Sequence, residues 1–204
     1  MADETRRERK KLQTRQLLVD TALRLFAEQG YEQTTIVQIT QAADVAKKTF
    51  FNHFPTKEDV LFADADQYVQ AAVEVIGERA PEEHVSDVLL EIYERVFARR
   101  LTGGPLSGAG KNLKQLDDTV MKLPAVQAKA LHVVFDLQQA IADALLKAYP
   151  RVLDPVTAAA AVGSLMGAAQ AAGTVSLRQG PSMEEYLTSI RRALDVALQG
   201  LRSL

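Results

Sequence analysis

The apolar residues of this 204-residue chain recur every three or four positions, which is the spacing of one face of an α-helix. The first such segment predicts a helix over about residues 11–29, with an apolar stripe made of Leu18, Ala22, Leu25 and Phe26. Gly30 follows and favours the end of this helix, because glycine accepts the positive φ of a helix terminus. No stretch keeps the alternation of apolar and polar residues that is typical of a strand. The pattern therefore predicts an all-α fold with about nine helices.

Residues 35–57 predict two short helices joined by a tight turn. Thr35 begins the first helix, and its hydroxyl makes a capping box with the Gln38 side chain. Asp44 supplies the turn, because a short polar side chain tolerates left-handed backbone geometry. The apolar face of this first helix consists of Ile36, Ile39 and Ala43.

The second short helix has an apolar face and a polar, basic face. Phe50 and Phe54 are four residues apart and share the apolar face, with Val45 placed to pack against them. Pro55 ends the helix because it has no N–H to donate. This is a helix-turn-helix pattern, in which the second helix enters a DNA groove; an ordinary packed pair with a solvated basic face is the alternative. The polar face presents Lys47, Lys48, Thr49, Phe51, Asn52 and His53.

The chain beyond residue 55 also has helical spacing. Thr56 is expected to cap a helix that runs to about residue 78, Asp154 to cap another, and Ser182 to open the last. The other predicted helices cover residues 85–101, 112–123, 124–149 and 155–178, with a loop rich in Gly and Pro at 102–110. The expected buried stripes are Val88, Leu89, Ile92, Val96 and Phe97; Leu131, Phe135, Gln138, Ala142, Leu145 and Leu146; and Ile190, Leu194, Ala197 and Leu201.

Residues 15–65 resemble the DNA-binding domain of the tetracycline-repressor (TetR) family of bacterial regulators. The resemblance is carried by RQLLVDTALRLFAEQGYEQTTIVQIT, followed directly by QAADVAKKTFFNHFPTKEDVL. It implies a ligand-responsive transcriptional regulator, most often a repressor. Residues 1–60 would form the DNA-binding domain, and residues 61–204 a domain for ligand binding and dimerisation. The chain departs from the family pattern at Asp44 (usually Gly), Ala46 (often Ser), Lys48 (commonly a small residue) and Phe51 (usually Tyr).

The second short helix supplies most of the residues expected to contact DNA. Lys47 and Lys48 could read guanine edges or hold phosphates, and Asn52 could pair with adenine. Lys57 lies at a helix N-terminus, where a cation is unfavourable unless an anion such as a DNA phosphate lies opposite. The resemblance implies the same phosphate contact. The full expected set is Thr35, Lys47, Lys48, Thr49, Phe51, Asn52, His53 and Lys57.

A basic cluster precedes the first helix. The net charge of −2 gives no general indication of nucleic-acid binding, so this cluster and the basic helix carry the expectation. A basic arm is placed to meet phosphates or a minor groove, and a solvated tail is the alternative. The cluster consists of Arg6, Arg7, Arg9, Lys10 and Lys11.

Gly163 and Gly167 lie four residues apart in an alanine-rich segment, a spacing that allows close helix–helix approach. The resemblance implies that the last two helices pair with their copies in a homodimer, whose two-fold symmetry fits a palindromic double-stranded DNA operator. A seam inside the monomer core is the alternative. Residues 155–177 carry no charge over a membrane-spanning length, but they are mostly small residues. We therefore expect a buried helix and no membrane partner.

Composition excludes several kinds of site. There are no cysteines, and His53, His84 and His132 lack the spacing of metal ligands, so neither a metal nor a cofactor is expected. A phosphate-binding Gly loop and a nucleophile elbow are both missing, so no enzyme is expected. No apolar run follows the charged N-terminus, so we expect the protein to stay in the cytoplasm.

The C-terminal helices are expected to bind a small-molecule effector of unknown identity. Helical bundles commonly house ligands, and aromatic and polar groups on apolar faces line such pockets. A helical small-molecule-binding protein without DNA activity is the alternative function, although such a protein would not need the basic helix. Candidate effector residues, each of which core packing also explains, are Tyr93, Phe97, His132, Phe135 and Gln139.

Overall fold

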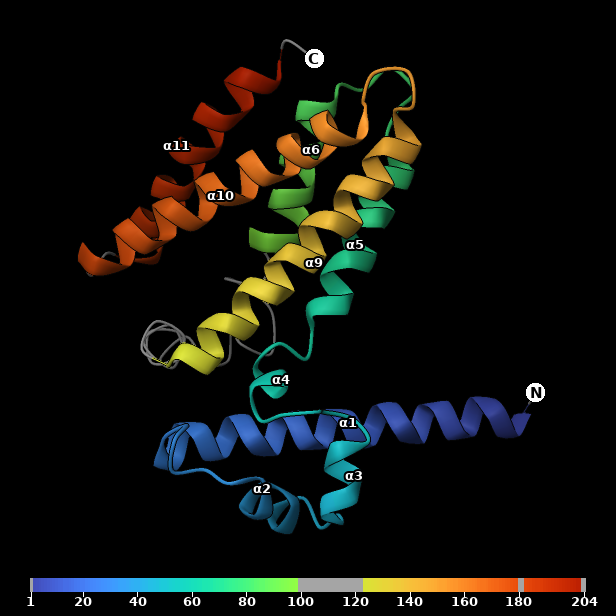
Figure 1. Cartoon of the computed structure of the whole chain (residues 1–204), viewed down its shortest axis with the longest axis vertical. Coiled ribbons are helices and arrows are strands. Elements are labelled where there is room, and N and C mark those ends of the chain that lie inside the picture. The colour runs from blue at the N-terminus through green and yellow to red at the C-terminus, as the bar shows by residue number, and fades with distance from the viewer. Residues whose placement is uncertain (1, 99–122, 180–181, 203–204) are drawn as a thin grey trace. The chain divides into compact units, whose positions relative to one another are not determined.

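The computed structural model describes residues 2–98, 123–179 and 182–202, and all regular structure in these ranges is helical. The all-α prediction is confirmed (Figure 1). The predicted loop at 102–110 lies outside the described residues, as does the predicted helix at 112–123 apart from its last residue. The elements are α1 (Ala2–Gln29), α2 (Ile36–Ala42), α3 (Lys47–Phe51), α4 (Glu58–Leu61), α5 (Ala65–Glu78), α6 (Val85–Ile92), the π-helical segment η1 (Tyr93–Ala98), α9 (Pro124–Ala148), α10 (Pro155–Gln179) and α11 (Met183–Leu201).

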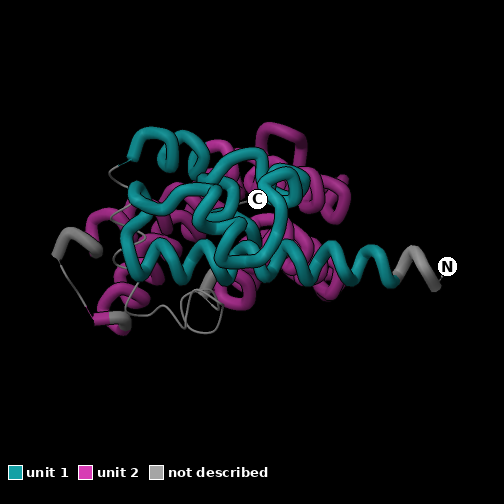
Figure 2. The backbone as a smooth tube through the Cα atoms, turned by 90° about the horizontal axis from the view of Figure 1, so that it is seen from below, with its two compact units in different colours: residues 1–64, 111–131 teal, residues 65–110, 132–204 magenta. Residues whose placement is uncertain are grey.

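The chain forms two compact units, which Figure 2 shows in different colours. Unit 1 consists of residues 1–64 and 111–131, and unit 2 of residues 65–110 and 132–204. Helix α9 is shared, because its first residues belong to unit 1 and the rest to unit 2. Unit 1 therefore contains residues 111–131 in addition to the N-terminal residues that are expected to bind DNA.

Helix α1 buries the predicted stripe in the core of unit 1. Leu18, Ala22 and Phe26 are each at most 6% exposed. Gly30 (φ 90°) ends the helix, and its N–H donates to the Phe26 carbonyl at 3.0 Å. The spacing of apolar residues and the glycine stop thus predicted this part of the helix correctly.

Helix α1 begins at Ala2, well before the predicted start near residue 11. The reason is local, because residues 2–11 contain many Arg, Glu and Lys, which favour helix, and neither Gly nor Pro. The apolar stripe starts later, so periodicity alone missed the extension. The basic residues between 6 and 11 are exposed side chains on a helix.

Helices α4 and α5 replace the single helix predicted from Thr56. The N-cap of α4 is Lys57, which makes no side-chain cap bond, so the predicted Thr56 cap is one residue too early. Thr56 still bonds to the first turn: the Asp59 N–H donates to its hydroxyl at 3.4 Å, and the Asp59 carboxylate accepts the Thr56 N–H at 2.8 Å. The helix stops after one turn because Phe62 leaves helical geometry (φ −114°, ψ 22°). In this break the Ala63 carbonyl accepts a hydrogen bond from the Arg15 guanidinium at 2.9 Å. A bond from a side chain 48 positions away could not be foreseen from local spacing.

Unit 2 has its own hydrophobic core, built from α5, α6, η1, α9, α10 and α11. The helix predicted from residue 85 is present as α6, which continues into η1. The predicted stripes of this segment and of α11 are buried at Val88, Leu89, Ile92, Val96, Ile190, Leu194 and Leu201.

Helix α9 buries a different face from the one predicted for its first half. Leu131 and Phe135 are 61% and 64% exposed, whereas Leu137, Ile141 and Leu145 are buried. Apolar residues occur on more than one side of this helix. Periodicity therefore indicated a helix but could not decide which side meets the core.

Helices α10 and α11 pack side by side (Figure 1). The Asp154 carboxylate caps α10 by accepting the Val156 and Thr157 N–H groups at 2.8 and 3.1 Å. Ser182 and Glu185 form the predicted capping box of α11. Both helix starts follow from residues within a few positions of each other.

Helices α10 and α11 lie close together at Gly173. A Cβ atom there would lie 3.0 Å from the Tyr186 hydroxyl oxygen, a tight contact that the Tyr186 side chain would have to shift to accept. A Cβ atom at Gly163 or Gly167 would meet nothing within 4 Å. The two glycines singled out from the sequence therefore make no tight seam within the described chain, and their side of α10 is open.

Candidate nucleic-acid interface

Helix α2 is defined by its N-terminal cap and by the turn that follows it. The Thr35 hydroxyl accepts the Gln38 N–H at 3.2 Å, and the Gln38 side chain accepts the Thr35 N–H at 2.8 Å. Asp44 has a φ of 50°, which matches the left-handed geometry expected of it. The Val45 N–H then donates to the Thr40 carbonyl at 3.0 Å, which closes the turn before α3.

Helix α3 is anchored to the core of unit 1 by two phenylalanines. Phe50 and Phe54 are 0% and 1% exposed, and their ring centroids lie 5.7 Å apart. Ala46 is the N-cap and offers no side-chain hydrogen bond, as predicted. The Phe54 N–H donates to the Phe50 carbonyl at 2.8 Å, so the helical turn continues beyond α3 up to Pro55.

The other side of α3 faces solvent. Phe51 is 46% exposed, and the Lys47 Nζ lies 5.9 Å from its ring centroid because the two residues are four apart on one face. The predicted DNA contacts on α3 and at its end, together with Thr35 at the start of α2, are at least partly exposed. Exposed members are Thr35, Lys47, Lys48, Phe51 and Asn52, and half-buried members are Thr49 and His53.

His53 differs from the lysines in its charge. Burial lowers its pKa from the ordinary value, and the nearby cations Arg15 and Lys11 lower it further. A neutral imidazole at physiological pH can donate or accept a hydrogen bond but adds no positive charge. His53 therefore offers hydrogen bonding to a partner, in contrast to Lys47 and Lys48.

Lys57 is half-buried, and its ammonium group contacts the loop between α1 and α2. Its Nζ donates to the Tyr31 and Thr34 carbonyls at 2.7 and 3.0 Å and lies 4.0 Å from the Tyr31 ring centroid. Burial lowers the Lys57 pKa, and Glu58 and Glu32 oppose this effect. Two of the three N–H donors are thus used within the protein. The phosphate contact expected from the sequence stays a prediction.

Arg15 links α1 to the residues after α3 and α4, a role that was not predicted from the sequence. Its guanidinium donates to the His53 carbonyl at 3.1 Å and to the Ala63 carbonyl at 2.9 Å, and lies 4.4 Å from the Phe54 ring centroid. The signal was present in the sequence, because Arg15 lies three positions before Leu18 on the apolar face of α1. A cation on an apolar stripe usually has an internal partner.

A polar network surrounds the start of α4. The Tyr31 hydroxyl donates to the Glu58 carboxylate at 2.8 Å, and burial is the main reason that the pKa of Tyr31 is raised. Asp59 pairs with Lys129 of α9 at 2.6 Å within unit 1. These bonds hold the first turn of α4 against the rest of the unit, next to the exposed face of α3.

Residues 35–54 thus form a capped short helix, a left-handed turn and an anchored second helix with an exposed basic side. Residues 18–63 match the family model described as bacterial regulatory proteins, tetR family. The predicted resemblance to the TetR family is thus confirmed over the stretch whose geometry is described above.

Two curated relatives are helix-turn-helix regulators by name. The HTH-type transcriptional regulator TcmR of Streptomyces glaucescens is 35% identical over 102 residues, which are 50% of this chain and 45% of TcmR. The HTH-type transcriptional repressor AcnR of Corynebacterium diphtheriae is 32% identical over 75 residues, 37% of this chain and 40% of AcnR. The chain therefore spans less than half the length of these relatives. Both are named as regulators of transcription and not as enzymes, in agreement with the expectation.

A solved structure shares the fold over almost the whole chain. It is FadR of Thermus thermophilus, described as a TetR-family transcriptional repressor in complex with lauroyl-CoA. The match has 23% sequence identity and a TM-score of 0.57, and covers 92% of this chain and 94% of FadR. At this identity the likeness shows the common fold alone.

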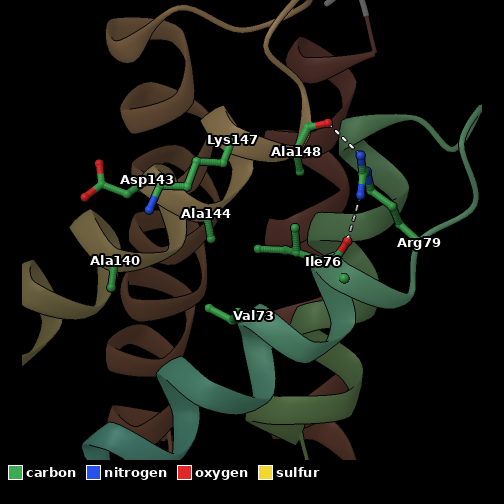
Figure 3. A pocket seen from close by; sticks show the side chains of 9 residues that line it. Val73, Ile76, Arg79, Ala140, Asp143, Ala144, Lys147 and Ala148 are labelled. Carbon is green, nitrogen blue, oxygen red and sulfur yellow. Dashed lines mark hydrogen bonds between the residues drawn. The ribbon is translucent and has the colours of Figure 1, made fainter.

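Unit 2 contains a groove of about 520 Å³ between α5 and α9. Figure 3 shows small and aliphatic side chains on its walls, with the Arg79 guanidinium held at one end by the Ile76 and Ala148 carbonyls. None of the predicted effector residues lines this groove. Its lining residues are Val73, Ile76, Gly77, Arg79, Ala140, Asp143, Ala144, Lys147 and Ala148.

The predicted effector residues lie in different surroundings. Tyr93 is half-buried, and burial with a contribution from Tyr186 raises its pKa to about 12. His132 and Phe135 are exposed, and Gln139 donates to the Asp143 carboxylate at 3.2 Å. The Phe97 side chain lies outside the described part of the structure. The role of these residues in effector binding stays a prediction.

One described helix has the length and apolar composition of a membrane span, Pro155–Ser176 within α10, with 28% of the tested window buried. Such a feature is weak evidence for a membrane, because helices of soluble proteins pass the same test. The exposed residues of this helix are mostly small.

Proposed function

We propose that this chain is a transcriptional regulator that binds double-stranded DNA through α3. The observation that carries the proposal is the two-sided character of α3. Phe50 is fully buried on one side, while Lys47, Lys48 and Asn52 are exposed on the other. A helix held in this way can enter a major groove and present its side chains to base edges and phosphates.

The contacts follow from the chemistry of each exposed group. Lys47 and Lys48 would hold phosphates or read guanine, and Asn52 would pair with adenine. Phe51 would meet a thymine methyl or a sugar, since it has no hydroxyl to donate. Supporting contacts to the DNA backbone would come from Thr35, Thr49, His53 and Lys57.

The regulator is proposed to act as a homodimer through α10 and α11. One face of α10 is uncharged and exposed between Val156 and Val175, which suits close packing against a second copy. Two copies related by two-fold symmetry would present two α3 helices to a palindromic operator. The exposed residues on this face are Val156, Ala160, Ser164, Gly167, Ala171 and Val175.

We propose that the regulator acts in the cytoplasm and represses transcription. A small-molecule effector would relieve this repression. The names of AcnR and FadR support repression, and the groove and core of unit 2 offer room and apolar surface for a ligand. The effector would act only if it binds the DNA-competent and DNA-incompetent states with different free energy. The identity of the effector is left open.

The test is a selection of DNA by the protein itself. The wild-type chain would be used to enrich duplexes from a random-sequence pool, and the enriched duplex would be compared with a scrambled duplex by fluorescence anisotropy at several salt concentrations. We expect a palindromic consensus, at least a hundredfold preference for it, and a steep fall of affinity with salt. Equal, weak binding to both duplexes would reject the proposed function.

A further inference from the structure

Helix α9 has residues in both units of the chain. Its residues up to 131 are assigned to unit 1, and those from 132 onward to unit 2. The helix contains no glycine, and its one proline, Pro124, is its first residue. Neither helix-breaking residue therefore interrupts its backbone hydrogen bonds. α9 is one continuous element that takes part in the DNA-binding unit and in the unit that is expected to bind the effector.

The first part of α9 is anchored in unit 1 by an apolar side chain and an ion pair. Val126 is 0% exposed and belongs to the same hydrophobic cluster as Phe54, which follows α3, and Val60 of α4. Three residues later, the Lys129 Nζ lies 2.6 Å from an Asp59 carboxylate oxygen. The exposed fractions of these two side chains are only 30% and 14%. Solvent and salt therefore screen this pair less than a fully exposed one.

Asp59 connects Lys129 to the segment that follows α3. Its other carboxylate oxygen accepts the Thr56 N–H at 2.8 Å and the Thr56 hydroxyl at 2.6 Å. Thr56 is two residues after Phe54 and directly precedes Lys57. A cation of α9, a carboxylate of α4 and the exit of the DNA-reading helix are thus joined by consecutive hydrogen bonds.

The second part of α9 is buried in unit 2. Leu137, Ile141 and Leu145 belong to the hydrophobic core of that unit. Ala140 lies on the same part of the helix and lines the groove between α5 and α9 (Figure 3). A ligand that shifts or stiffens this part of α9 therefore acts on the same helix that carries Lys129.

We propose that Lys129 is a positioning residue, which holds the exit of α3 through Asp59 and Thr56 and so couples DNA reading to the part of α9 in unit 2. The inference rests on the proposed DNA binding and leaves every proposed DNA contact in place. DNA that fixes the exit of α3 then stabilises α9 in unit 2, and an effector that displaces α9 weakens DNA binding. Thermodynamic linkage requires these two effects to be equal.

Linkage makes this coupling measurable with DNA as the only ligand. Amide hydrogen exchange reports the free energy of local opening, so the bound DNA should slow exchange in residues 136–148 of α9. The duplex selected by the protein is the probe, and the scrambled duplex gives the baseline. An ion pair that only stabilises the fold would change exchange equally with and without DNA, and would leave the DNA-dependent difference as it is.

The experiment uses two full-length variants with matched controls. Lys129→Met removes the cation and keeps an aliphatic stem, Lys129→Arg keeps a cation, and Arg24→Met removes an exposed ion pair inside α1. Leu131→Gly weakens the helix at the last residue of α9 in unit 1, and Leu131→Ala is its control. Leu131 is 61% exposed, so neither change removes a buried side chain. Each variant is first shown to be folded by circular dichroism, and is then saturated with each duplex.

We expect the selected duplex to slow exchange in residues 136–148 of the wild-type protein about fivefold or more, the lower end of usual coupling factors. Lys129→Met and Leu131→Gly should lose this slowing even when they are saturated with the duplex. Lys129→Arg, Leu131→Ala and Arg24→Met should keep it. Lys129→Met should also bind the selected duplex several-fold more weakly with an unchanged salt slope, because no phosphate contact is removed.

Three results would overturn the proposal. Equal slowing in saturated Lys129→Met and wild type would show that the coupling does not pass through Lys129. No slowing in the saturated wild-type protein would show that α9 is not coupled to DNA binding, and the proposed function would stand without it. Failure of the wild-type protein to enrich any duplex would reject DNA binding itself, and the coupling with it.

Discussion

Asp44 adopts the disfavoured left-handed backbone geometry that the turn between α2 and α3 requires. It is the non-glycine residue with positive φ (50°) among the described residues. An L-residue in this region is disfavoured by roughly 1 kcal/mol or more, and a short polar side chain offsets part of that cost. We expect Asp44→Gly to raise the free energy of unfolding by up to about 1 kcal/mol, measured by urea titration. Asp44→Ala, which keeps the Cβ but loses the carboxylate, should lower it; a glycine variant less stable than wild type would contradict this account.

Glu58 and Asp59 make the stability of unit 1 depend on pH. Burial alone would raise the pKa of Asp59, but hydrogen bonds from Lys129 and Thr56 lower it. Burial acts the same way on Glu58, whose pKa is lowered by hydrogen bonds that include the Tyr31 hydroxyl. A carboxylate with a lowered folded pKa contributes stability that is present above the unfolded pKa and is lost as pH falls through the folded pKa.

The unfolded pKa values of these groups are 3.8 for Asp and 4.5 for Glu. We therefore expect the thermal midpoint of the wild-type protein to be constant above about pH 5.5 and to fall steadily below that value. Asp59→Asn should be less stable at pH 7 and should show a smaller fall in acid. Parallel curves for the two proteins, followed by circular dichroism from pH 7 to pH 3, would argue against the Asp59 contribution.

Helix α3 begins without a side-chain cap, because Ala46 has no oxygen to offer to the exposed N–H groups. Ala46→Ser should supply that oxygen, since residue 46 already has the extended backbone of an N-cap. We expect a gain of about 1 kcal/mol in the free energy of unfolding, measured by urea titration. Ala42→Ser, inside α2, is the control and should be slightly destabilising. A gain at both positions, or at neither, would contradict the capping explanation.

Helices were predicted best where their ends depend on nearby residues. The cap at Thr35, the stop at Gly30 and the caps at Asp154 and Ser182 all appear as expected. The break between α4 and α5 was missed, because it involves a bond from Arg15 that crosses the unit. Periodicity carries no information about such a bond.

The assembly of two chains should depend on the open face of α10. A Cβ atom at Gly167 would have no atom within 4 Å apart from those of its own helix, so the monomer should tolerate a charged side chain there. In the proposed dimer the same charge would be buried at the seam at a cost of several kcal/mol. We expect Gly167→Arg to sediment as a folded monomer at micromolar concentration and to bind the selected palindrome much more weakly than wild type. Val73→Arg, on an exposed position of α5, should remain dimeric; a Gly167→Arg dimer would place the interface elsewhere.

For the molecule as a whole, local chemistry along the chain was enough to predict the all-α class, most helix starts, and the helix-turn-helix with its buried and exposed faces. Caps, turns and amphipathic stripes depend on residues within about four positions of one another, and the sequence displays these directly. Tertiary structure decided what distant segments do to each other. It placed the Arg15 and Lys57 donors on carbonyls 23 to 48 positions away. It also determined which face of α9 is buried and brought α10 and α11 close together at Gly173. These outcomes depend on which surfaces meet in three dimensions, and residue spacing along one helix does not contain that information.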